Sequence, residues 1–390
     1  MSTRVLFISS VFPPDIGGPS QQSASLTQEL AAQGLSVNLL LPEGKRVPVS
    51  RPRLLTRVVR DVGRGGRAPV WKLLRLVNLF QFFCASIARV RPIAIHIQVF
   101  GDPFGLMAIL AARLMGVPIL VKLTGEKHVE WAGEHGEGGW RVVLLRGLDW
   151  AQLHAADRVW TTSPQFQVRL RREYNLSRKQ VLMLPNFIEL EGFEAVAARR
   201  TKQVGKGLQV LCVARLRPWK GLEHTLRACA LAGDAVAGLT IVGCGSEDYL
   251  AALKRLAVRL GIDSRVSFRP AVAPDAIAST YGSADVFILL SDYEPFGIVL
   301  VEAMAAGLPV IATHTGGIPS VLGELGPECM VAPGDADAAG KLLIELSQSS
   351  ERIDRLVVAG RRRARRFDLA SGARRLHEAY IELGGHHCVI

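Results

Sequence analysis

The sequence predicts an α/β protein built from two doubly wound, parallel-sheet domains that face a cleft. Short apolar runs alternate with helical patterns along the whole chain, which is typical of parallel α/β architecture. The length of 390 residues exceeds what a single core usually organises. With 49% hydrophobic and 21% charged residues, the composition is that of a folded protein and excludes disorder, collagen-like repeats and coiled coil.

The first half contains the elements of one Rossmann-like domain, expected over 1–190. Its strands are expected where short runs of Val, Ile, Leu and Phe lie between turn residues, at 5–9, 37–41, 93–99, 118–123, 158–162 and 181–184. Between these runs the spacing of apolar residues predicts helices over 20–33, 71–89, 104–115 and 139–155. The segment 191–207 then loses the alternation and gathers Ala, Arg, Lys and Gly, so we interpret it as a linker.

A second alternating series predicts a C-terminal Rossmann-like domain over 208–366. Its strands are expected at 208–213, 239–242, 266–268, 285–290 and 309–312, and its helices at 221–231, 247–260, 274–282, 297–306 and 336–347. A last helix, 369–383, belongs to a segment, 367–390, that we expect to cross back to the N-terminal domain. Open α/β sheets bind ligands at the carboxyl ends of their strands, so the cleft between the domains is the expected site.

The positive charge of the chain is concentrated in one segment. Between Lys45 and Arg91 there are twelve basic residues and one acid, Asp61, so this segment carries +11 of the net charge of +12. Aromatic residues are not interleaved with the basic ones, which argues against a nucleic-acid partner. Four arginines precede an apolar, amphipathic stretch here, so we expect 45–91 to meet an anionic membrane surface; a solvated basic loop is the alternative.

The sequence shows neither the targeting signal nor the paired cysteines that are typical of an exported protein. The six cysteines are scattered without a C-x-x-C pair, which argues against a disulfide scaffold and a zinc site. The apolar run at 5–8 is too short for a signal peptide, and polar residues interrupt the longest apolar segment, 71–90. We therefore expect a cytoplasmic protein, peripheral on the inner face of the cell membrane.

Glycine loops and basic groups point to a phosphate-binding site. The first strand leads into Gly17 and Gly18, whose backbone amides can approach a phosphate at a helix N-terminus, although two glycines after a strand often form only a turn. Arg215 follows strand 208–213 and Lys220 precedes the next helix, so both are expected to converge on one anion. An arginine fork with a lysine charge suits a diphosphate; two basic residues in an exposed loop are the alternative.

Two glutamates mark the helix expected over 297–306. Glu294 lies in the loop before it, and Glu302 stands inside it among Val, Leu, Ala and Met. A lone carboxylate in so apolar a helix is costly to bury without partners, which sugar hydroxyls would supply. Glu302 lies roughly 7–8 Å beyond the helix start, which suits a phosphate on the first amides and a ribose on this carboxylate. A structural salt bridge is the competing account.

The chain resembles the retaining glycosyltransferases of family 4, which adopt the B-type glycosyltransferase (GT-B) fold. The resemblance is carried by the Arg215-x4-Lys220 pair, by the Ile-Val-Gly-Cys-Gly-Ser turn at 241–246 and by the E-x7-E spacing from Glu294 to Glu302. It extends over nearly the whole chain, through the first glycine loop, the Leu-Pro-Asn at 184–186 and the Gly-Gly-Ile-Pro at 316–319. It implies an acceptor-side N-terminal domain and a C-terminal donor domain.

The resemblance also implies a role for each group. Arg215 and Lys220 would hold the diphosphate of the donor, Glu294 the hydroxyls of its sugar and Glu302 its ribose. Backbone amides would complete the donor site, at Gly17, Gly18, Phe296, Gly297 and Ile298. The acceptor side would contain Lys122, Glu126 and His128, although the His-Gly or His-Asp pair of many members is missing there.

The implied reaction moves a hexosyl unit from a UDP- or GDP-sugar to a sugar, lipid-linked or small-molecule acceptor, with retention of configuration. Arg215, Lys220 and Glu294 are the expected catalytic groups, and the product would be a glycan, a glycolipid or a glycosylated natural product. We expect no cofactor and no metal, because basic side chains supply the positive charge. The Asp-Ala-Asp at 335–337 is interpreted as a helix cap. A nucleotide-sugar epimerase of the same fold and a non-catalytic nucleotide-sugar-binding protein are the alternatives.

Overall fold

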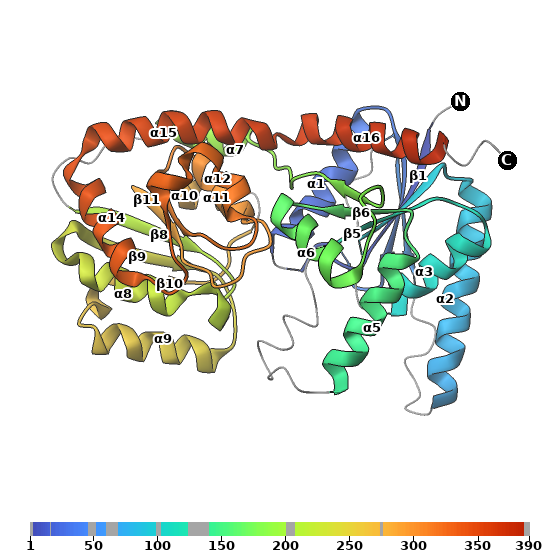
Figure 1. Ribbon diagram of the computed structural model, residues 1–390, viewed down its shortest axis with the longest axis horizontal. Helices are drawn as coiled ribbons and strands as arrows, with labels where there is room; N and C mark the ends of the chain where they lie inside the picture. Colours follow the sequence, from blue (N-terminus) through green and yellow to red (C-terminus); the bar gives the residue numbers. More distant parts are fainter. Residues whose placement is uncertain are drawn as a thin grey trace. The chain divides into compact units, whose positions relative to one another are not determined.

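The computed structural model describes residues 3–15, 17–45, 52–59, 69–98, 103–123, 140–199, 207–273 and 276–385. The chain divides into two compact units, each with its own parallel sheet (Figure 1). Unit 1 comprises Met1–Phe187 and Leu369–Ile390, and unit 2 comprises Ile188–Asp368. The predicted class, two parallel-sheet α/β domains, is therefore confirmed, whereas the cleft expected between them stays a prediction.

The strands of unit 1 form a seven-stranded parallel sheet. They are β1 (Arg4–Ser9), β2 (Ser36–Pro42), β3 (Leu54–Val59), β4 (Ala94–Gln98), β5 (Ile119–Lys122), β6 (Arg158–Thr161) and β7 (Val181–Met183). Their order is β3-β2-β1-β4-β5-β6-β7, so the winding direction reverses between β1 and β4. Helices cover both faces of the central strands, which explains why these strands are unbroken apolar runs.

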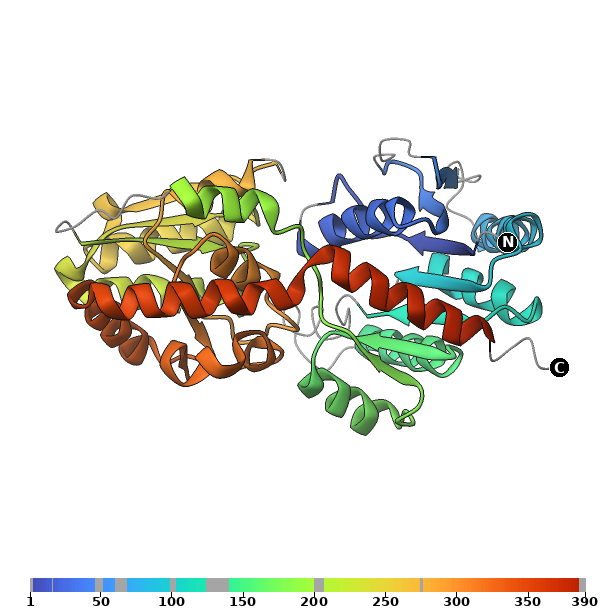
Figure 2. The same ribbon diagram turned by 90° about the horizontal axis from the view of Figure 1, so that it is seen from above.

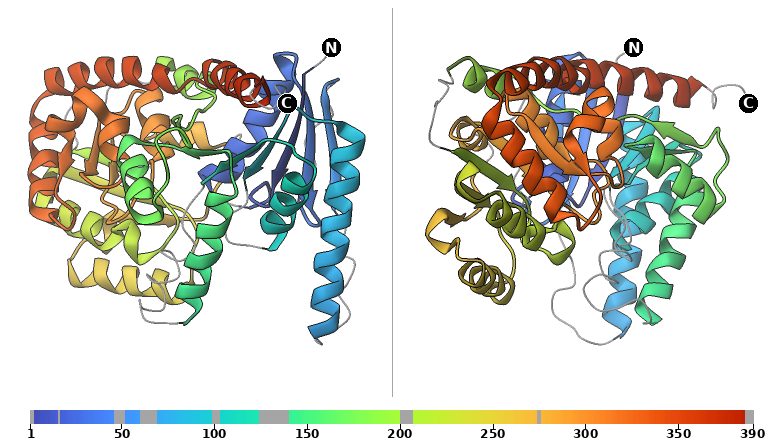
Figure 3. Two further views of the ribbon diagram at one scale, coloured as in Figure 1. Left: turned by 45° about the vertical axis from the view of Figure 1, so that its right-hand side comes forward. Right: turned by 60° about the vertical axis from the view of Figure 1, so that its left-hand side comes forward.

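Two apolar clusters hold helices against the two faces of this sheet. The helices α1 (Gly18–Ala32) and α16 (Leu369–Gly385) lie side by side over one face (Figure 2). The other face carries α2 (Pro69–Val90), α3 (Pro103–Leu114), α5 (Trp140–His154) and α6 (Pro164–Tyr174), with α2 as a long rod (Figure 3). The C-terminal helix is part of this core, because Tyr380 is fully buried and its hydroxyl lies 2.5 Å from Nδ1 of His96.

Unit 2 is a six-stranded parallel sheet between two helical layers. Its strands are β8 (Leu208–Val213), β9 (Val236–Val242), β10 (Val266–Arg269), β11 (Val286–Leu289), β12 (Val310–Thr313) and β13 (Met330–Val331). Their order is β10-β9-β8-β11-β12-β13, so the winding reverses between β8 and β11. One continuous apolar cluster joins the sheet to both helical layers.

The helices of unit 2 segregate by their contacts (Figure 1). One face carries α8 (Leu222–Ala232), α9 (Glu247–Arg259) and α14 (Ala336–Gln348). The other carries α7 (Glu191–Arg199), α10 (Ile277–Gly282), α11 (Ile298–Ala305) and α15 (Ser350–Ala364). The short helices α12 (Ile318–Leu322) and α13 (Gly326–Cys329) connect β12 to β13.

The structure contains elements that the sequence pattern did not predict. β3 lies in the basic segment, where arginines obscure its alternation, and β13 is only two residues long. The helices α6 and α15 are rich in arginine, so their apolar stripes are narrow. Residues 191–199, expected to start a linker, form α7 instead, because buried Phe193 packs edge-on against Tyr281 at 5.6 Å. Residues 200–206 of that expected linker lie outside the described residues.

Candidate active site

The carboxyl edge of the unit 2 sheet gathers the loops that carry most of the predicted donor-binding residues. β8 and β11 are neighbours on either side of the reversal in winding. Arg215 and Lys220 follow β8, and Glu294 follows β11, so parallel pairing brings all three to one edge. Open α/β sheets bind ligands at such a reversal. The residues assigned from sequence thus lie where the fold itself predicts a ligand.

Glycines let these loops pack backbone against backbone. Gly221 is the N-cap of α8 with φ +62°, and a Cβ there would overlap the carbonyl oxygen of Leu290, just after β11. A Cβ on Gly243 would overlap the loop that follows β8, and one on Gly316 would overlap the carbonyl oxygen of Glu294. Only residues without a Cβ permit so close an approach. The loops after β8, β9, β11 and β12 are therefore locked to one another.

Lys220 and Glu294 form an ion pair at this edge. Lys220 ends a single 3₁₀ turn, η1 (Pro218–Lys220), and its Nζ lies 2.7 Å from Oε2 of Glu294. Their side chains are only 11% and 12% exposed, so the pair is largely shielded from solvent. A shielded charge pair holds both long side chains in one geometry. The sequence assigned these groups to the diphosphate and to the sugar of a donor, and the structure places them in contact.

The amino end of α11 follows Glu294, one member of this pair, by a few residues. Gly297, with φ +90°, is its N-cap and provides no side-chain hydrogen bond to it. No side chain among the described residues caps the first backbone N–H groups of α11, and such groups attract anions. The loop is anchored by buried Phe296, which packs edge-on against Phe367 at 5.6 Å. Arg215 is exposed on the same edge of the sheet.

Glu302 has a partner that the sequence did not reveal. The hydroxyl of Tyr281, on α10, donates a 2.5 Å hydrogen bond to Oε2 of Glu302. Removal from water raises the pKa of Glu302 to about 7, and the hydrogen bond from Tyr281 limits that rise. Burial, together with the adjacent carboxylate, raises the pKa of Tyr281. The salt bridge considered as an alternative is absent among the described residues, where the recorded partner of Glu302 is a neutral hydroxyl.

Replacing Glu302 with glutamine is expected to stabilise unit 2 at pH 8 by about 1–3 kcal/mol. A carboxyl group whose pKa rises on folding contributes stability below its unfolded value, near 4.5, and that contribution is lost as the pH rises through about 7. Urea unfolding at pH 5 and pH 8 checks this, because the advantage of Glu302→Gln should grow between the two. An advantage that is the same at both pH values would contradict the prediction.

Two further polar contacts lie near the carboxyl edge of the unit 2 sheet, and the sequence did not predict them. Oδ1 of Asp292, after β11, lies 3.8 Å from Nε2 of His224 on α8. The hydroxyl of Tyr249, on α9, donates a 2.8 Å hydrogen bond to Glu223 on α8. No sequence spacing links these residues, since they come from different βα units. Their proximity is a product of the sheet order.

At the carboxyl edge of the unit 1 sheet, the predicted groups lie at the start of α1 and the end of β5. Gly17, with φ +135°, is the N-cap of α1, which begins at Gly18. Lys122 is 1% exposed, and its Nζ donates to Oε1 of Gln22 on α1 and lies 4.0 Å from the centre of the Trp160 ring. Burial lowers the pKa of Lys122 well below its ordinary value. The amine thus faces the interior of unit 1.

Other buried polar atoms lie on α1, which carries Gln22, and at the end of β4, the strand that pairs with β5. Three of them have no hydrogen-bond partner within the part of the chain that the structure describes: Ser20 Oγ, Gln22 Nε2 and Gln98 Oε1. Nε2 of Gln98 donates to the carbonyl oxygen of Pro19 in the first turn of α1. Buried polar groups are normally paired, so orphans here indicate a site that a polar ligand or water would complete.

Replacing Lys122 with methionine is expected to raise the stability of unit 1 at pH 7, by about 1–3 kcal/mol. A lysine whose pKa falls on folding costs stability at neutral pH, and this cost disappears as the pH rises towards 10.5. The gain from Lys122→Met should therefore shrink between pH 7 and pH 10 in parallel urea titrations. A destabilised variant at pH 7 would show that the amine supports the fold.

The remaining predicted positions divide into one confirmed and two untested. Asp335 caps α14, with Oδ1 accepting a 2.9 Å hydrogen bond from the N–H of Ala338, so the predicted helix cap is confirmed. Glu126 and His128, predicted on the acceptor side, lie outside the described residues.

Two family models match the chain, one on each unit. The model described as "Glycosyl transferase 4-like domain" matches residues 17–186, and the model described as "Glycosyl transferases group 1" matches residues 197–363. This chain belongs to the group 1 glycosyltransferases. The predicted family is thereby confirmed, and the two sheets are those of a GT-B glycosyltransferase.

Curated relatives of this glycosyltransferase carry names from inositol glycosylation. A protein named D-inositol 3-phosphate glycosyltransferase from Streptomyces avermitilis is 30% identical over 70% of this chain and 61% of its own length. One of the same name from Acidothermus cellulolyticus is 29% identical over 80% and 74%. A Mycobacterium tuberculosis protein named GDP-mannose-dependent alpha-(1-6)-phosphatidylinositol monomannoside mannosyltransferase is 30% identical over 46% and 49%. The chain thus spans about 61% of the length of the first of these relatives.

Solved structures agree on the fold. Sucrose-phosphate synthase from Thermosynechococcus elongatus has a TM-score of 0.80 at 24% identity and covers 98% of this glycosyltransferase and 100% of its own chain. The Anabaena protein HepE, solved with UDP-glucose, has a TM-score of 0.74 at 18% identity, over 96% and 98%. Among the described residues, none of the helices combines the length and apolar character that a membrane crossing requires.

Proposed function

We propose that this group 1 glycosyltransferase moves a hexosyl unit from a nucleoside-diphosphate sugar to an acceptor hydroxyl, with retention at the anomeric carbon. The observation that carries the proposal is the contact of Lys220 with Glu294, 2.7 Å apart at the edge where the winding of unit 2 reverses. A lysine there suits a diphosphate, and a carboxylate beside it suits the hydroxyls of the attached sugar. Arg215, on the same edge, adds a second cation.

The mechanism follows from where charge develops. When the bond from the anomeric carbon to the diphosphate breaks, negative charge accumulates on the departing phosphate oxygens. Lys220, Arg215 and the N–H groups at the start of α11 are arranged before the reaction to stabilise that charge, which is worth several kcal/mol in preorganised sites. The acceptor attacks from the face that the diphosphate leaves, and a departing phosphate oxygen accepts its proton. Because these groups supply positive charge, we propose that the reaction needs no metal.

The remaining predicted residues complete the donor and acceptor sites in this proposal. Glu302 accepts from the ribose hydroxyls, with Tyr281 holding its carboxylate in place. The amides of Phe296, Gly297 and Ile298 bind the sugar and the phosphate. Gly17 and Gly18 provide amides at the start of α1. On the acceptor side, Lys122, Glu126 and His128 stay proposals, with Lys122 acting through Gln22.

The donor and acceptor classes are proposed from the relatives. HepE binds UDP-glucose, and the mycobacterial relative is named as GDP-mannose-dependent, which supports a UDP- or GDP-sugar donor. The relatives act, by their names, on inositol phosphate and on a phosphatidylinositol mannoside. We therefore propose a sugar, lipid-linked or small-molecule acceptor bearing a free hydroxyl, and a product in glycan, glycolipid or glycosylated natural-product synthesis.

One assay separates the proposal from its two alternatives. The protein is incubated with radiolabelled UDP- and GDP-sugars, with and without a panel of sugar and inositol acceptors, and the products are resolved by chromatography and NMR. A glycosylated acceptor with the anomeric configuration of the donor supports the proposal, and its formation in the presence of EDTA supports metal independence. An epimerised nucleotide sugar would instead establish an epimerase, and binding without turnover a non-catalytic protein.

A separate proposal concerns location: a cytoplasmic protein held at the inner face of the membrane through residues 45–91. The support is the +11 charge of this segment, together with four partly exposed apolar side chains of β3 and α2: Leu55, Val58, Leu74 and Val77. Screening weakens such attraction, so vesicles of anionic lipid should sediment the protein at low salt and release it at high salt. Sedimentation that is absent at low salt, or unchanged by salt, would refute this.

A further inference from the structure

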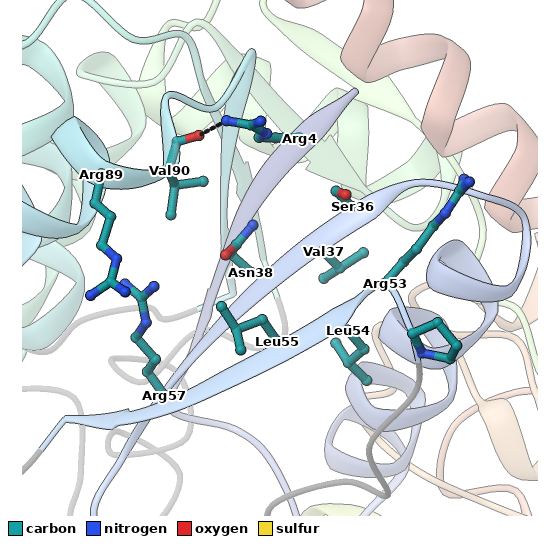
Figure 4. A pocket seen from close by; sticks show the side chains of 11 residues that line it. Arg4, Ser36, Val37, Asn38, Arg53, Leu54, Leu55, Arg57, Arg89 and Val90 are labelled. Carbon is teal, nitrogen blue, oxygen red and sulfur yellow. Dashed lines mark hydrogen bonds between the residues drawn. The ribbon is translucent and has the colours of Figure 1, made fainter. Parts of the chain in front are cut away.

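A hollow of about 770 Å³ lies on the unit 1 sheet, at the opposite ends of the strands from the unit 1 groups proposed for sugar transfer (Figure 4). Its walls are the amino ends of β1 and β2, the strand β3 and the last turn of α2. Gly17 and Lys122 lie instead at the carboxyl ends of the strands. The described residues of the lining include no acid and four arginines: Arg4, Arg53, Arg57 and Arg89. Such a concentration of one charge in a concave site attracts anions.

Two of these arginines face each other, and no counter-ion lies between them among the residues that the structure places. Arg57, half-buried on β3, and Arg89, exposed on α2, direct their guanidinium groups toward one another (Figure 4). Neither has a hydrogen bond or an ion pair within the residues that the structure describes. Like charges at short range repel, and an anion between them would turn this repulsion into two favourable contacts.

The other two arginines are oriented by main-chain contacts. Arg4 donates a 3.3 Å hydrogen bond to the carbonyl oxygen of Val90, the last residue of α2. Arg53 donates to the carbonyl oxygen of Gly34, in the turn before β2. Each contact uses one nitrogen of a guanidinium group that has five N–H donors. The hollow is thus bordered by cations whose positions are partly fixed and whose remaining donors are unused by these bonds.

A neutral polar group accompanies the arginines. Asn38 is half-buried on β2 and pairs in register with Leu55 of β3, and its side chain lies in the hollow between Arg4 and Arg57 (Figure 4). No hydrogen bond to its side-chain amide occurs among the described residues. An amide donor flanked by guanidinium forks matches the several acceptor oxygens of a phosphate group, and bidentate contacts of this kind are the strong ones.

We propose that this hollow is a second anion site that binds a phosphate monoester or a diphosphate, separate from the proposed donor site of unit 2. The lining also contains the apolar residues Val37 and Leu55, which the carbon skeleton of a phosphate ester could contact. Two sources present this chemistry: a free phosphorylated metabolite and the headgroup of a phospholipid such as phosphatidic acid. The site holds the phosphate between Arg57 and Arg89, with Asn38 donating to a third oxygen.

Isothermal titration with inorganic pyrophosphate tests the site. Lys220→Ala is used as the background, because it removes the proposed donor contact and leaves the hollow intact. Adding Arg57→Gln and Arg89→Gln should weaken the remaining pyrophosphate binding at least tenfold. Adding Arg171→Gln and Arg172→Gln is the matched control, since these exposed arginines of α6 remove the same charge elsewhere on unit 1. Affinity within twofold of the background, or an equal loss in the control, overturns the proposal.

Vesicles distinguish the two sources of the phosphate. Vesicles with phosphatidic acid are compared with phosphatidylcholine vesicles at 0.15 M salt, using the full chain. If the Arg57→Gln and Arg89→Gln pair loses both pyrophosphate and phosphatidic acid, the site takes a lipid headgroup; if it loses pyrophosphate alone, the site takes a free phosphate. Loss of neither overturns the proposal.

The thermal midpoint of the Arg57→Gln and Arg89→Gln variant without ligand should not fall, because removing two facing cations relieves repulsion. A large fall would mean that the arginines stabilise the fold instead. If Lys220→Ala alone leaves pyrophosphate binding unchanged, that result counts against the proposed donor site and not against the site in the hollow.

Discussion

Replacing Lys220 with alanine is expected to lower kcat for sugar transfer by about 10²–10³-fold while the fold survives. In the proposed reaction this amine meets the charge that builds up on the departing diphosphate, so the loss should be larger in the transition state than in donor binding. Removal also leaves Glu294 without the partner that lies 2.7 Å away in the free protein. Steady-state kinetics over a range of donor concentrations measure the effect, because a fall in kcat with a modest change in the KM for the donor indicates transition-state stabilisation.

The control for this prediction is another lysine of the same unit. Lys341 is exposed on α14, so Lys341→Ala removes an equal charge and should keep near-normal turnover. Glu294→Gln should also lose most activity, and a double-mutant cycle of Lys220→Ala with Glu294→Gln shows whether the pair acts as one unit. Turnover by Lys220→Ala within threefold of the parent would remove this residue from the catalytic machinery.

Replacing Gly221 with alanine is expected to cost unit 2 at least about 3 kcal/mol and to abolish transfer. The added methyl group would overlap the carbonyl oxygen of Leu290, and the residue also has a positive φ of +62°. Relief of that overlap requires the loop after β8 to move away from the loop after β11, and these loops carry Lys220 and Glu294. Chemical denaturation and the transfer assay therefore report the same displacement.

A second glycine of unit 2 separates crowding from backbone strain. Gly261 has nearly the same φ, +67°, but no atom lies within 4 Å of the position that a Cβ would take. Gly261→Ala should therefore cost only about 1 kcal/mol, from the left-handed conformation alone, and leave activity intact. Equal losses of stability in both variants would mean that the close approach of the two loops is unimportant.

Much of the fold was readable from sequence because it depends on local pattern. Fully buried parallel strands need unbroken apolar runs, and the helices between them need an apolar stripe, so both leave a signal in any short window. The signal failed where charge obscured it. β3 lies among arginines, α15 ends in three of them, and α7 has a stripe of only a few apolar residues around Phe193. These elements are defined by the surfaces they pack against.

The candidate site also has a part that was predictable from sequence and a part that was not. The order of residues along the chain placed Arg215, Lys220, Glu294 and Glu302 around loops and a helix start, and the parallel sheet brought the first three to one edge. Their contacts were not predictable. Tyr281 reaches Glu302 from another helix, and Lys122 faces Gln22 across a hundred residues of sequence. No spacing rule connects such pairs.

The sequence by itself determined the alternation of strands and helices, the family and the types of residue at the ends of β8 and β11. These follow from hydrophobic periodicity and from chemistry carried by single residues. Only the tertiary structure decided which charges meet, which carboxylate is removed from water and which arginines converge on a hollow in unit 1. The physical reason is that charge–charge energy and desolvation depend on distance and burial, and strand order sets both between residues that are far apart in the chain.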